Sequence, residues 1–330
     1  MRSTRSGWST SPSSRPVHSM RSSLTRGATS VSDRATPVKA GGHRVAIVLG
    51  LAPVTAVLSL LFIGPLLVAL AQSLGHAPIY GVEEFPTLRY YAHVLGSSRF
   101  RIALLYTLYY AVVPTIVSTV AGVALALALR HPIRGSRVLV AVLRLPVVVP
   151  YLVGASVVVA LFANGGLIAR VLFALGAIGS TGDFPRVLFS AGGWGVMLVY
   201  LFKQIPFTFI VVSAALAGDG AQYEEVARSL GATPVRALWH VVLPRVVPAI
   251  VTASLLVFAF NFQTYEIPYL LGATFPNTLP VEAMRRFNAA DLSRRPEAMA
   301  YLMVITAISG VVLAAYLQVY RRWERGRGRS

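Results

Sequence analysis

Polar side chains next to apolar stretches are the first candidates for chemistry in this sequence. The strongest group is Asn261, Gln263, Tyr265 and Glu266, which follows a long apolar run. Amide, phenol and carboxylate groups at the depth of an apolar stretch are costly, and they often contact a transported solute. The same groups can instead hold helices together at a water-facing mouth. The sequence leaves both interpretations open.

Two further apolar stretches carry a charged or amide residue. Arg144 precedes Pro146 by two residues, and Lys203 and Gln204 lie shortly before Pro206. Arg144 and Gln204 are further candidates for a solute pathway. For all three residues we favour contacts between helices, or snorkelling of the long side chains toward water.

Several catalytic and metal-binding chemistries lack the residues they need. The chain contains 0 Cys, which excludes disulfides, thiolate metal sites and thiol nucleophiles. Its 6 His residues are scattered, without the helical spacing of metal ligands. No GxSxG elbow is present, and neither Lys39 nor Lys203 follows a GxxxxGK[ST] loop. We therefore expect no catalytic residue, no metal and no cofactor bound by this chain.

A polar segment between the fourth and fifth apolar stretches has the pattern of two short helices joined by a sharp turn. Glu224 and Arg228 are four residues apart, in the acid-first order that stabilises a helix. Gly231 suits the left-handed position after a helix end. Thr233 suits the N-cap of the next helix, and Pro234 suits its first position.

The elements around these residues are predicted to be membrane helices. The chain of 330 residues is 55% hydrophobic and 13% charged, whereas a soluble domain carries about 25% charged residues. A spanning helix needs about 20 apolar residues. The stretches that satisfy this are 45–70, 102–129, 138–162, 190–216, 247–269 and 299–320. We expect an all-α integral membrane protein with about six transmembrane helices.

The basic residues predict how these helices are oriented. The net charge of +18 gathers at the ends of apolar stretches, which argues against nucleic-acid binding. Lys and Arg favour the cytoplasmic side, so both termini are expected there. Residues 1–44 are expected to form a disordered basic cytoplasmic tail, and residues 321–330 a basic cytoplasmic tail. The short apolar segment 166–178 is expected to lie on the outer surface or to re-enter the membrane.

The polar segment resembles the EAA motif of binding-protein-dependent ABC import permeases. That motif reads Glu-Ala-Ala, three residues, Gly, nine residues and Ile-x-Leu-Pro. The matching positions are Glu225, Ala227, Gly231, Leu243 and Pro244, with Val226 and Val241 as small apolar replacements. The resemblance extends over 102–320.

The resemblance implies an ABC transmembrane type-1 domain over 102–320, with 45–70 as a peripheral first span and 217–246 as a cytoplasmic coupling loop. Residues Glu224, Glu225, Ala227, Arg228, Gly231, Leu243 and Pro244 would couple the loop to an ATPase. The implied partners are two ATPase subunits that carry ATP and Mg²⁺, a second permease that is a different chain or another copy, an extracytoplasmic solute-binding protein, and membrane lipid. The implied location is the cytoplasmic membrane.

The solute is the most open part of this interpretation. Residues 265–272 are similar to the polyamine, iron and thiamine branch of the family, which favours a spermidine/putrescine-like permease. Glu266 would suit a cationic solute. The alternatives are a sugar importer, a multispanning channel or carrier without an ATPase partner, and a soluble basic binding protein.

Overall fold

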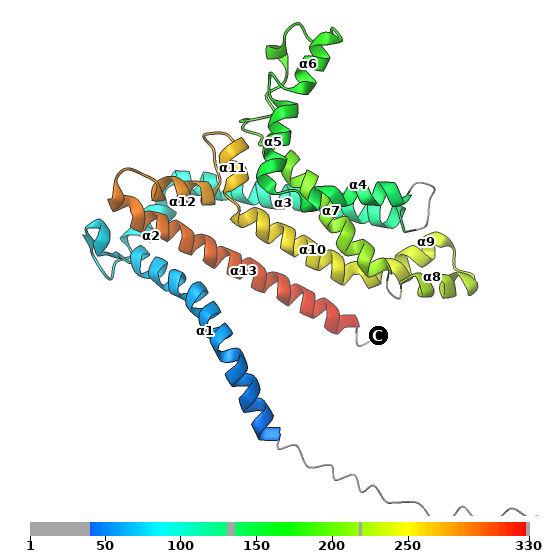
Figure 1. Ribbon diagram of the computed structural model, residues 1–330, viewed down its shortest axis with the longest axis horizontal. Coiled ribbons are helices and arrows are strands. Elements are labelled where there is room, and N and C mark those ends of the chain that lie inside the picture. The colour runs from blue at the N-terminus through cyan, green and yellow to red at the C-terminus, as the bar shows by residue number, and fades with distance from the viewer. Residues whose placement is uncertain (1–39, 131–135, 218–219, 328–330) are drawn as a thin grey trace, which may run out of the picture. The chain divides into compact units, whose positions relative to one another are not determined.

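The computed structural model describes residues 40–130, 136–217 and 220–327 (Figure 1). The chain divides into two units, Met1–Leu58 and Ser59–Ser330. Helix α1 (Ala40–Ser73) begins in the first unit. Most of the tail predicted over 1–44 lies outside the described residues. Residues 40–44 belong to α1.

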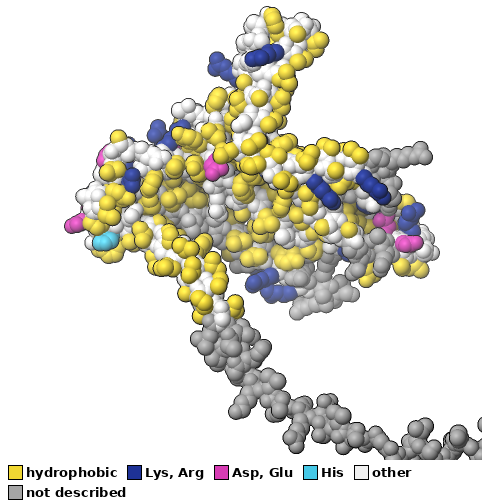
Figure 2. Space-filling view, in the orientation of Figure 1, with side chains coloured by type: hydrophobic (Ala, Val, Ile, Leu, Met, Phe, Trp, Pro, Cys, Tyr) yellow, Lys and Arg dark blue, Asp and Glu magenta, His cyan; other side chains and the backbone are white. Residues whose placement is uncertain are grey.

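Among the described residues, six helical segments are long and apolar enough to cross a membrane. They are Gly50–Ser73, Ser98–Ala128, Tyr151–Ala174, Trp194–Ala217, Pro234–Gln263 and Leu292–Arg322. Figure 2 shows hydrophobic side chains over most of the visible face. The predicted all-α fold with about six spans is confirmed, although several span boundaries differ from the prediction.

The second unit is built almost entirely of helices. Its helices are α2 (Arg89–Gly96), α3 (Ser98–Ala128), α4 (Ser136–Val148), α5 (Tyr151–Phe162), α6 (Leu167–Ala174), α7 (Trp194–Ala217), α8 (Gly220–Ser229), α9 (Pro234–Ala237), α10 (Leu243–Gln263), α11 (Glu266–Leu271), α12 (Leu279–Phe287) and α13 (Arg295–Arg327). The short turns are η1 (Pro78–Tyr80), η2 (Thr181–Asp183), the π-helix η3 (Leu238–Val242) and η4 (Leu292–Arg294). Strands β1 (His76–Ala77) and β2 (Val82–Glu83) form an antiparallel pair in which His76 faces Glu83.

Helices α3, α7 and α10 pack on one another and form the centre of the second unit. Helices α3 and α7 approach each other closely at Gly122, where an added Cβ would lie 2.6 Å from Cβ of Thr208 and 3.0 Å from the carbonyl oxygen of Ile205. Small residues allow membrane helices to approach this closely. The absence of a side chain at Gly122 therefore sets the spacing of the two helices.

The predicted third span, 138–162, is broken into α4 and α5. Proline has no N–H, and its ring clashes with the carbonyl four residues earlier. Pro150 therefore leaves the carbonyl of Pro146 without its helical donor, and α4 ends at Val148. The candidate span begins instead at Tyr151 and runs to Ala174 through α6, which takes in most of the short segment predicted separately.

The predicted fifth span, 247–269, also ends too late. Helix α10 stops at Gln263, and α11 begins at Glu266. Pro268 cannot donate to the carbonyl of Thr264 and clashes with it, so the same rule that breaks the third span separates α10 from α11. At its other end α10 continues from α9 through η3, so the second loop helix runs directly into the span.

The last helix is longer than its apolar stretch. Helix α13 runs from Arg295 to Arg327, whereas 299–320 was predicted with a basic tail from 321. The tail is thus helical through residue 327. Arg and Glu favour helix formation even where the segment is too polar to remain in lipid, which is why hydropathy underestimates its length.

A buried charge cluster fixes α12 against α13. Arg286 donates from Nη1 to Oε2 of Glu282 at 2.7 Å and from Nε to Oε1 of Glu297 at 2.9 Å. Burial acts to lower the pKa of Arg286, but these hydrogen bonds outweigh it, so the pKa is raised above its ordinary value. The guanidinium therefore stays charged and keeps the segment between the last two spans in place.

Candidate functional site

The turn between α8 and α9 has the geometry that its sequence predicts. Gly231 adopts a left-handed φ of 88°. Its N–H donates to the carbonyl of Arg228 at 3.0 Å, and the N–H of Ala232 donates to the carbonyl of Ala227 at 3.0 Å. This pair of hydrogen bonds defines a Schellman motif. The hydroxyl of Thr233 then accepts from the backbone N–H of Arg236 at 3.3 Å, which caps α9.

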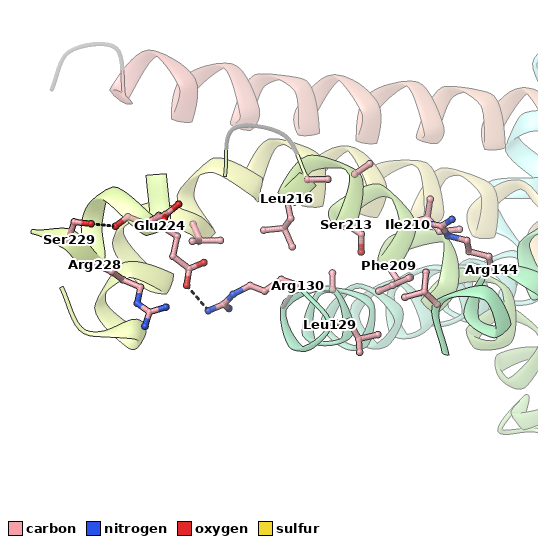
Figure 3. Close-up of a pocket in the computed structure, with 16 residues that line it drawn as sticks. Leu129, Arg130, Arg144, Phe209, Ile210, Ser213, Leu216, Glu224, Arg228 and Ser229 are labelled. Carbon is pink, nitrogen blue, oxygen red and sulfur yellow. Dashed lines mark hydrogen bonds and ion pairs between the residues drawn. The ribbon is translucent and has the colours of Figure 1, made fainter. Parts of the chain in front are cut away.

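Glu224 joins α8 to the end of α3. Its Oε1 lies 3.1 Å from Nη2 of Arg130, and Glu224 is only 7% exposed (Figure 3). The predicted pair within the helix is wrong: among the described residues there is no ion pair between Glu224 and Arg228. The buried carboxylate gains more from a partner in another segment, because Arg228 is exposed on the helix surface.

Tyr223 joins α8 to the start of α10. The guanidinium carbon of Arg245 lies 3.2 Å from the centroid of the Tyr223 ring, a cation–π contact. Two consecutive residues of α8 thus reach two different helices. These contacts tie α8 to both the end of α3 and the start of α10.

The described residues of 217–246, the predicted coupling segment, also present exposed side chains. Glu225 is exposed, and so are four large hydrophobic residues of α8, α9 and the turns beside them. They are Val226, Leu230, Val235 and Trp239, with exposed fractions of 56%, 84%, 66% and 60%. Leu243 and Pro244 are half-buried in the first turn of α10, and Ala227 is half-buried in α8. The segment therefore has an anchored side and an exposed apolar side.

A cavity of about 970 Å³ lies between the coupling segment and the ends of α3, α4 and α7. Arg130, Arg144, Glu224, Glu225 and Arg228 are in its wall (Figure 3). Arg144 was predicted to share a pathway with Asn261 and Gln204. It lies instead in the wall of this cavity near Ile210, at the end away from Glu224 and Arg228 (Figure 3), so the structure does not bring these three residues together.

Gln204 and Asn261 do meet, at the centre of the bundle. Nε2 of Gln204 donates to Oδ1 of Asn261 at 2.5 Å, and Nδ2 of Asn261 donates to Oε1 of Gln204 at 3.3 Å. Asn261 also donates to the hydroxyl of Thr115 at 3.5 Å. The three side chains are buried and link α7, α10 and α3. This geometry gives both amides a role in helix packing.

A Gln204→Leu substitution is expected to destabilise the permease by roughly 1 kcal/mol, because it leaves the buried amide of Asn261 without its main partner. Replacing both residues by Leu should cost less than the sum of the single changes. Thermal unfolding in detergent measures all three variants. Strictly additive costs, or lost uptake at unchanged stability, would instead assign the pair to solute contact.

Lys203 caps free backbone carbonyls at the break between α4 and α5. Its ammonium donates to the carbonyls of Pro146 at 2.7 Å and Val147 at 3.0 Å, and also to the carbonyl of Val149. These are carbonyls that the interrupted helix cannot satisfy. Since an ammonium has three donors, all of them are used, and the side chain is held in one position.

A second cavity, of about 280 Å³, lies beside this cap. It is lined by residues of α4, α5, α7 and α10, among them Tyr151, Lys203 and Phe260. The rings of Tyr151 and Phe260 stack with centroids 4.6 Å apart, and Nζ of Lys203 lies 4.9 Å from the Tyr151 centroid. Gln204 is in the same wall.

The remaining predicted pathway residues lie elsewhere. Gln263, Tyr265 and Glu266 are exposed at the end of α10 and the start of α11. Sequence reasoning missed Arg130, Arg245 and Tyr151 as members of these sites. The spacing of Pro146 and Pro150 was the available signal for a broken helix that needs an outside donor.

Comparisons with known proteins agree with this arrangement. Residues 118–323 match the family described as "Binding-protein-dependent transport system inner membrane component". The molybdenum transport system permease protein ModB of Mycobacterium tuberculosis is 31% identical over 62% of this chain and 75% of its own length. The putative 2-aminoethylphosphonate transport system permease protein PhnU of Salmonella choleraesuis is 30% identical over 68% of this chain and 76% of its own.

The fold also matches a solved bacterial ABC transporter involved in alginate import. The TM-score is 0.71 at 18% sequence identity, over 85% of this chain and 96% of that one. Together with the coupling segment, the comparisons identify the class. The chain belongs to the family of inner-membrane components of binding-protein-dependent transport systems. It is a multi-pass permease component of an ABC importer for a small solute, and not an enzyme.

Proposed function

We propose that this permease couples to its ATPase through residues 217–246. The observation that carries the proposal is the double anchor of α8, where Glu224 contacts Arg130 and Tyr223 contacts Arg245. The opposite side of the segment is apolar and exposed. An exposed apolar patch bordered by charges suits a protein partner. Glu225, beside this patch, then meets a basic residue of the ATPase.

The complete transporter contains two ATPase subunits, a second permease and an extracytoplasmic binding protein. Residues 102–320 form the transport domain, and both termini are cytoplasmic. The first span is peripheral to this domain, which agrees with the exposure of its side chains such as Leu60 and Phe62, at 72% and 78%. Closing of the ATPases moves the coupling segments together, and the spans tilt between inward-facing and outward-facing states.

A small oxyanion is the favoured solute. The relatives named above carry molybdenum and 2-aminoethylphosphonate in their names, and another is a probable sulfate permease of Chlorokybus atmophyticus, 29% identical over 56% of this chain. The polyamine alternative draws on the spermidine/putrescine permease PotC of Haemophilus influenzae, 27% identical over 40% of this chain. Glu266 is its only acidic candidate, and Glu266 is exposed, away from both cavities.

A pull-down tests the coupling assignment. We expect the tagged wild-type chain, taken from native membranes in mild detergent, to copurify with an ATPase subunit. Glu225→Lys should lose most of this ATPase, because it reverses the charge at the docking side. A wild-type chain that brings down no ATPase would instead make a channel or stand-alone carrier the leading interpretation.

The matched control is Glu83→Lys. It makes the same charge reversal at an exposed position of β2, before α3 begins and far along the chain from the coupling segment. This variant should retain the ATPase. Equal loss in both variants would mean that net charge, and not the coupling segment, governs the association.

A further inference from the structure

We propose that Lys203 makes the cavity of about 280 Å³ a passage site for a small oxyanion and selects anionic over cationic solutes. The proposal rests on the proposed importer function. It adds that Lys203 discriminates between solutes by their charge, and that this discrimination takes place in the smaller cavity.

The charge of Lys203 is fixed in place. Lys203 is 6% exposed, and its ammonium donates to three backbone carbonyls at the break between α4 and α5. Nζ also lies over the ring of Tyr151. Carbonyl dipoles and a ring face stabilise the charged form of the amine. They hold the cation without allowing it to move to the lipid surface.

The same charge has no counter-ion within reach. Among the described residues, no carboxylate lies within 4.0 Å of Nζ of Lys203. Neutral dipoles offset the cost of burial but leave a net charge of one unit. In surroundings of low dielectric constant this charge acts over a long distance. An anion that enters the cavity supplies the missing negative charge, whereas a polyamine is repelled.

The cavity has the size for a small solute, and apolar side chains make up most of its wall. A water molecule occupies about 30 Å³ of liquid, so about 280 Å³ holds a compact anion with some of its water. Tyr151 contributes a hydroxyl donor to the wall, and Phe207 and Leu256 contribute apolar surface. Few polar contacts and one fixed charge favour passage over tight retention.

A charge-sensing thiol tests the proposal without knowledge of the solute. The chain has 0 Cys, so Leu256→Cys introduces a single thiol in the wall of this cavity. Its reaction rates with sulfonatoethyl and trimethylammonioethyl methanethiosulfonate are measured on the purified complex, without nucleotide and after vanadate trapping. Each rate is divided by that of the same reagent with free mercaptoethanol. The corrected rate of the anionic reagent is then divided by that of the cationic reagent. A change in the reactivity of the thiol affects both rates equally and cancels in this anionic-to-cationic ratio.

We expect the anionic reagent to react faster, and Lys203→Gln to lower the anionic-to-cationic ratio by about tenfold or more. One unit charge about 10 Å away at an effective dielectric constant of about 20 produces a change of this size. Glutamine still donates to the carbonyls but carries no charge, so the helix break remains capped. Lys203→Arg should keep the ratio. Arg144→Met, which removes a cation outside this cavity, should also keep it.

Three results would overturn the proposal: a ratio unchanged in Lys203→Gln, a ratio lowered equally by Arg144→Met, or a thiol unreactive in both states. ATP-dependent uptake of spermidine by the wild-type transporter would do the same. Failure of the importer assignment is read separately, from a wild-type chain that brings down no ATPase in the pull-down. The reagent ratio can be measured on the permease in either case.

Discussion

A Gly231→Val permease is expected to reach the membrane in normal amounts and to lose most of its transport. The φ of 88° at Gly231 is accessible to glycine, whereas a β-branched residue there is strained by about 1–2 kcal/mol or more. No atom lies within 4 Å of the position of an added Cβ. The strain is therefore confined to the backbone, which must rotate and change the angle between α8 and α9.

Gly231→Asn is the matched control, because asparagine tolerates the left-handed conformation. It should retain most of the transport. Uptake of molybdate, sulfate or 2-aminoethylphosphonate is measured with whichever solute the wild-type transporter accumulates in the presence of ATP. Copurification of the ATPase is measured alongside. Equal uptake by the Val and Asn variants would show that the turn geometry is not needed for coupling.

A Gly122→Val permease is expected to fold poorly or to be destabilised by about 1–3 kcal/mol, the usual cost of overpacking. The added Cβ would lie 2.6 Å from Cβ of Thr208 and 3.0 Å from the carbonyl oxygen of Ile205. No side-chain rotation relieves either contact, because Cβ of Thr208 and the carbonyl of Ile205 are both fixed by the backbone of α7. Helices α3 and α7 must therefore separate along their contact.

Gly310→Val is the control for this change. Gly310 lies inside α13, where an added Cβ meets nothing within 4 Å. Both variants put valine in place of a helical glycine, so they share its intrinsic cost. The yield of monodisperse protein and the midpoint of thermal unfolding should fall for Gly122→Val alone. Similar losses in both would attribute the effect to helix propensity and not to the α3–α7 approach.

Short sequence patterns were sufficient to predict the helix ends and the turn, whereas the contacts at the sites join residues that are far apart in the sequence. The turn at Gly231 and the cap at Thr233 depend on neighbours within five residues, so the sequence was sufficient for them. Arg130 and Glu224 are 94 residues apart, and Gln204 and Asn261 are 57 apart. No pattern within one helix indicates such partners, because helix packing alone brings them together.

The same distinction explains the wrong span boundaries. Apolar length locates a membrane segment, but it does not reveal a proline that removes a backbone donor inside it. In a continuous helix Pro150 and Pro268 would each clash with the carbonyl four residues earlier, and each lies inside one of the predicted spans. Proline alone does not set such a boundary, because Pro114 and Pro206 lie inside α3 and α7 without ending them.

The cap made by Lys203 has a consequence for the order in which the protein is assembled. A lysine at the centre of an isolated spanning helix costs about 2.5–3.5 kcal/mol to insert. The backbone carbonyls that accept hydrogen bonds from the Lys203 ammonium precede it by 54 to 57 residues. During synthesis from the N-terminus, the acceptors therefore leave the ribosome before the ammonium does. Helix α7 can therefore insert into the bilayer next to the segment that carries these carbonyls. Its insertion depends on that earlier segment being in the membrane already.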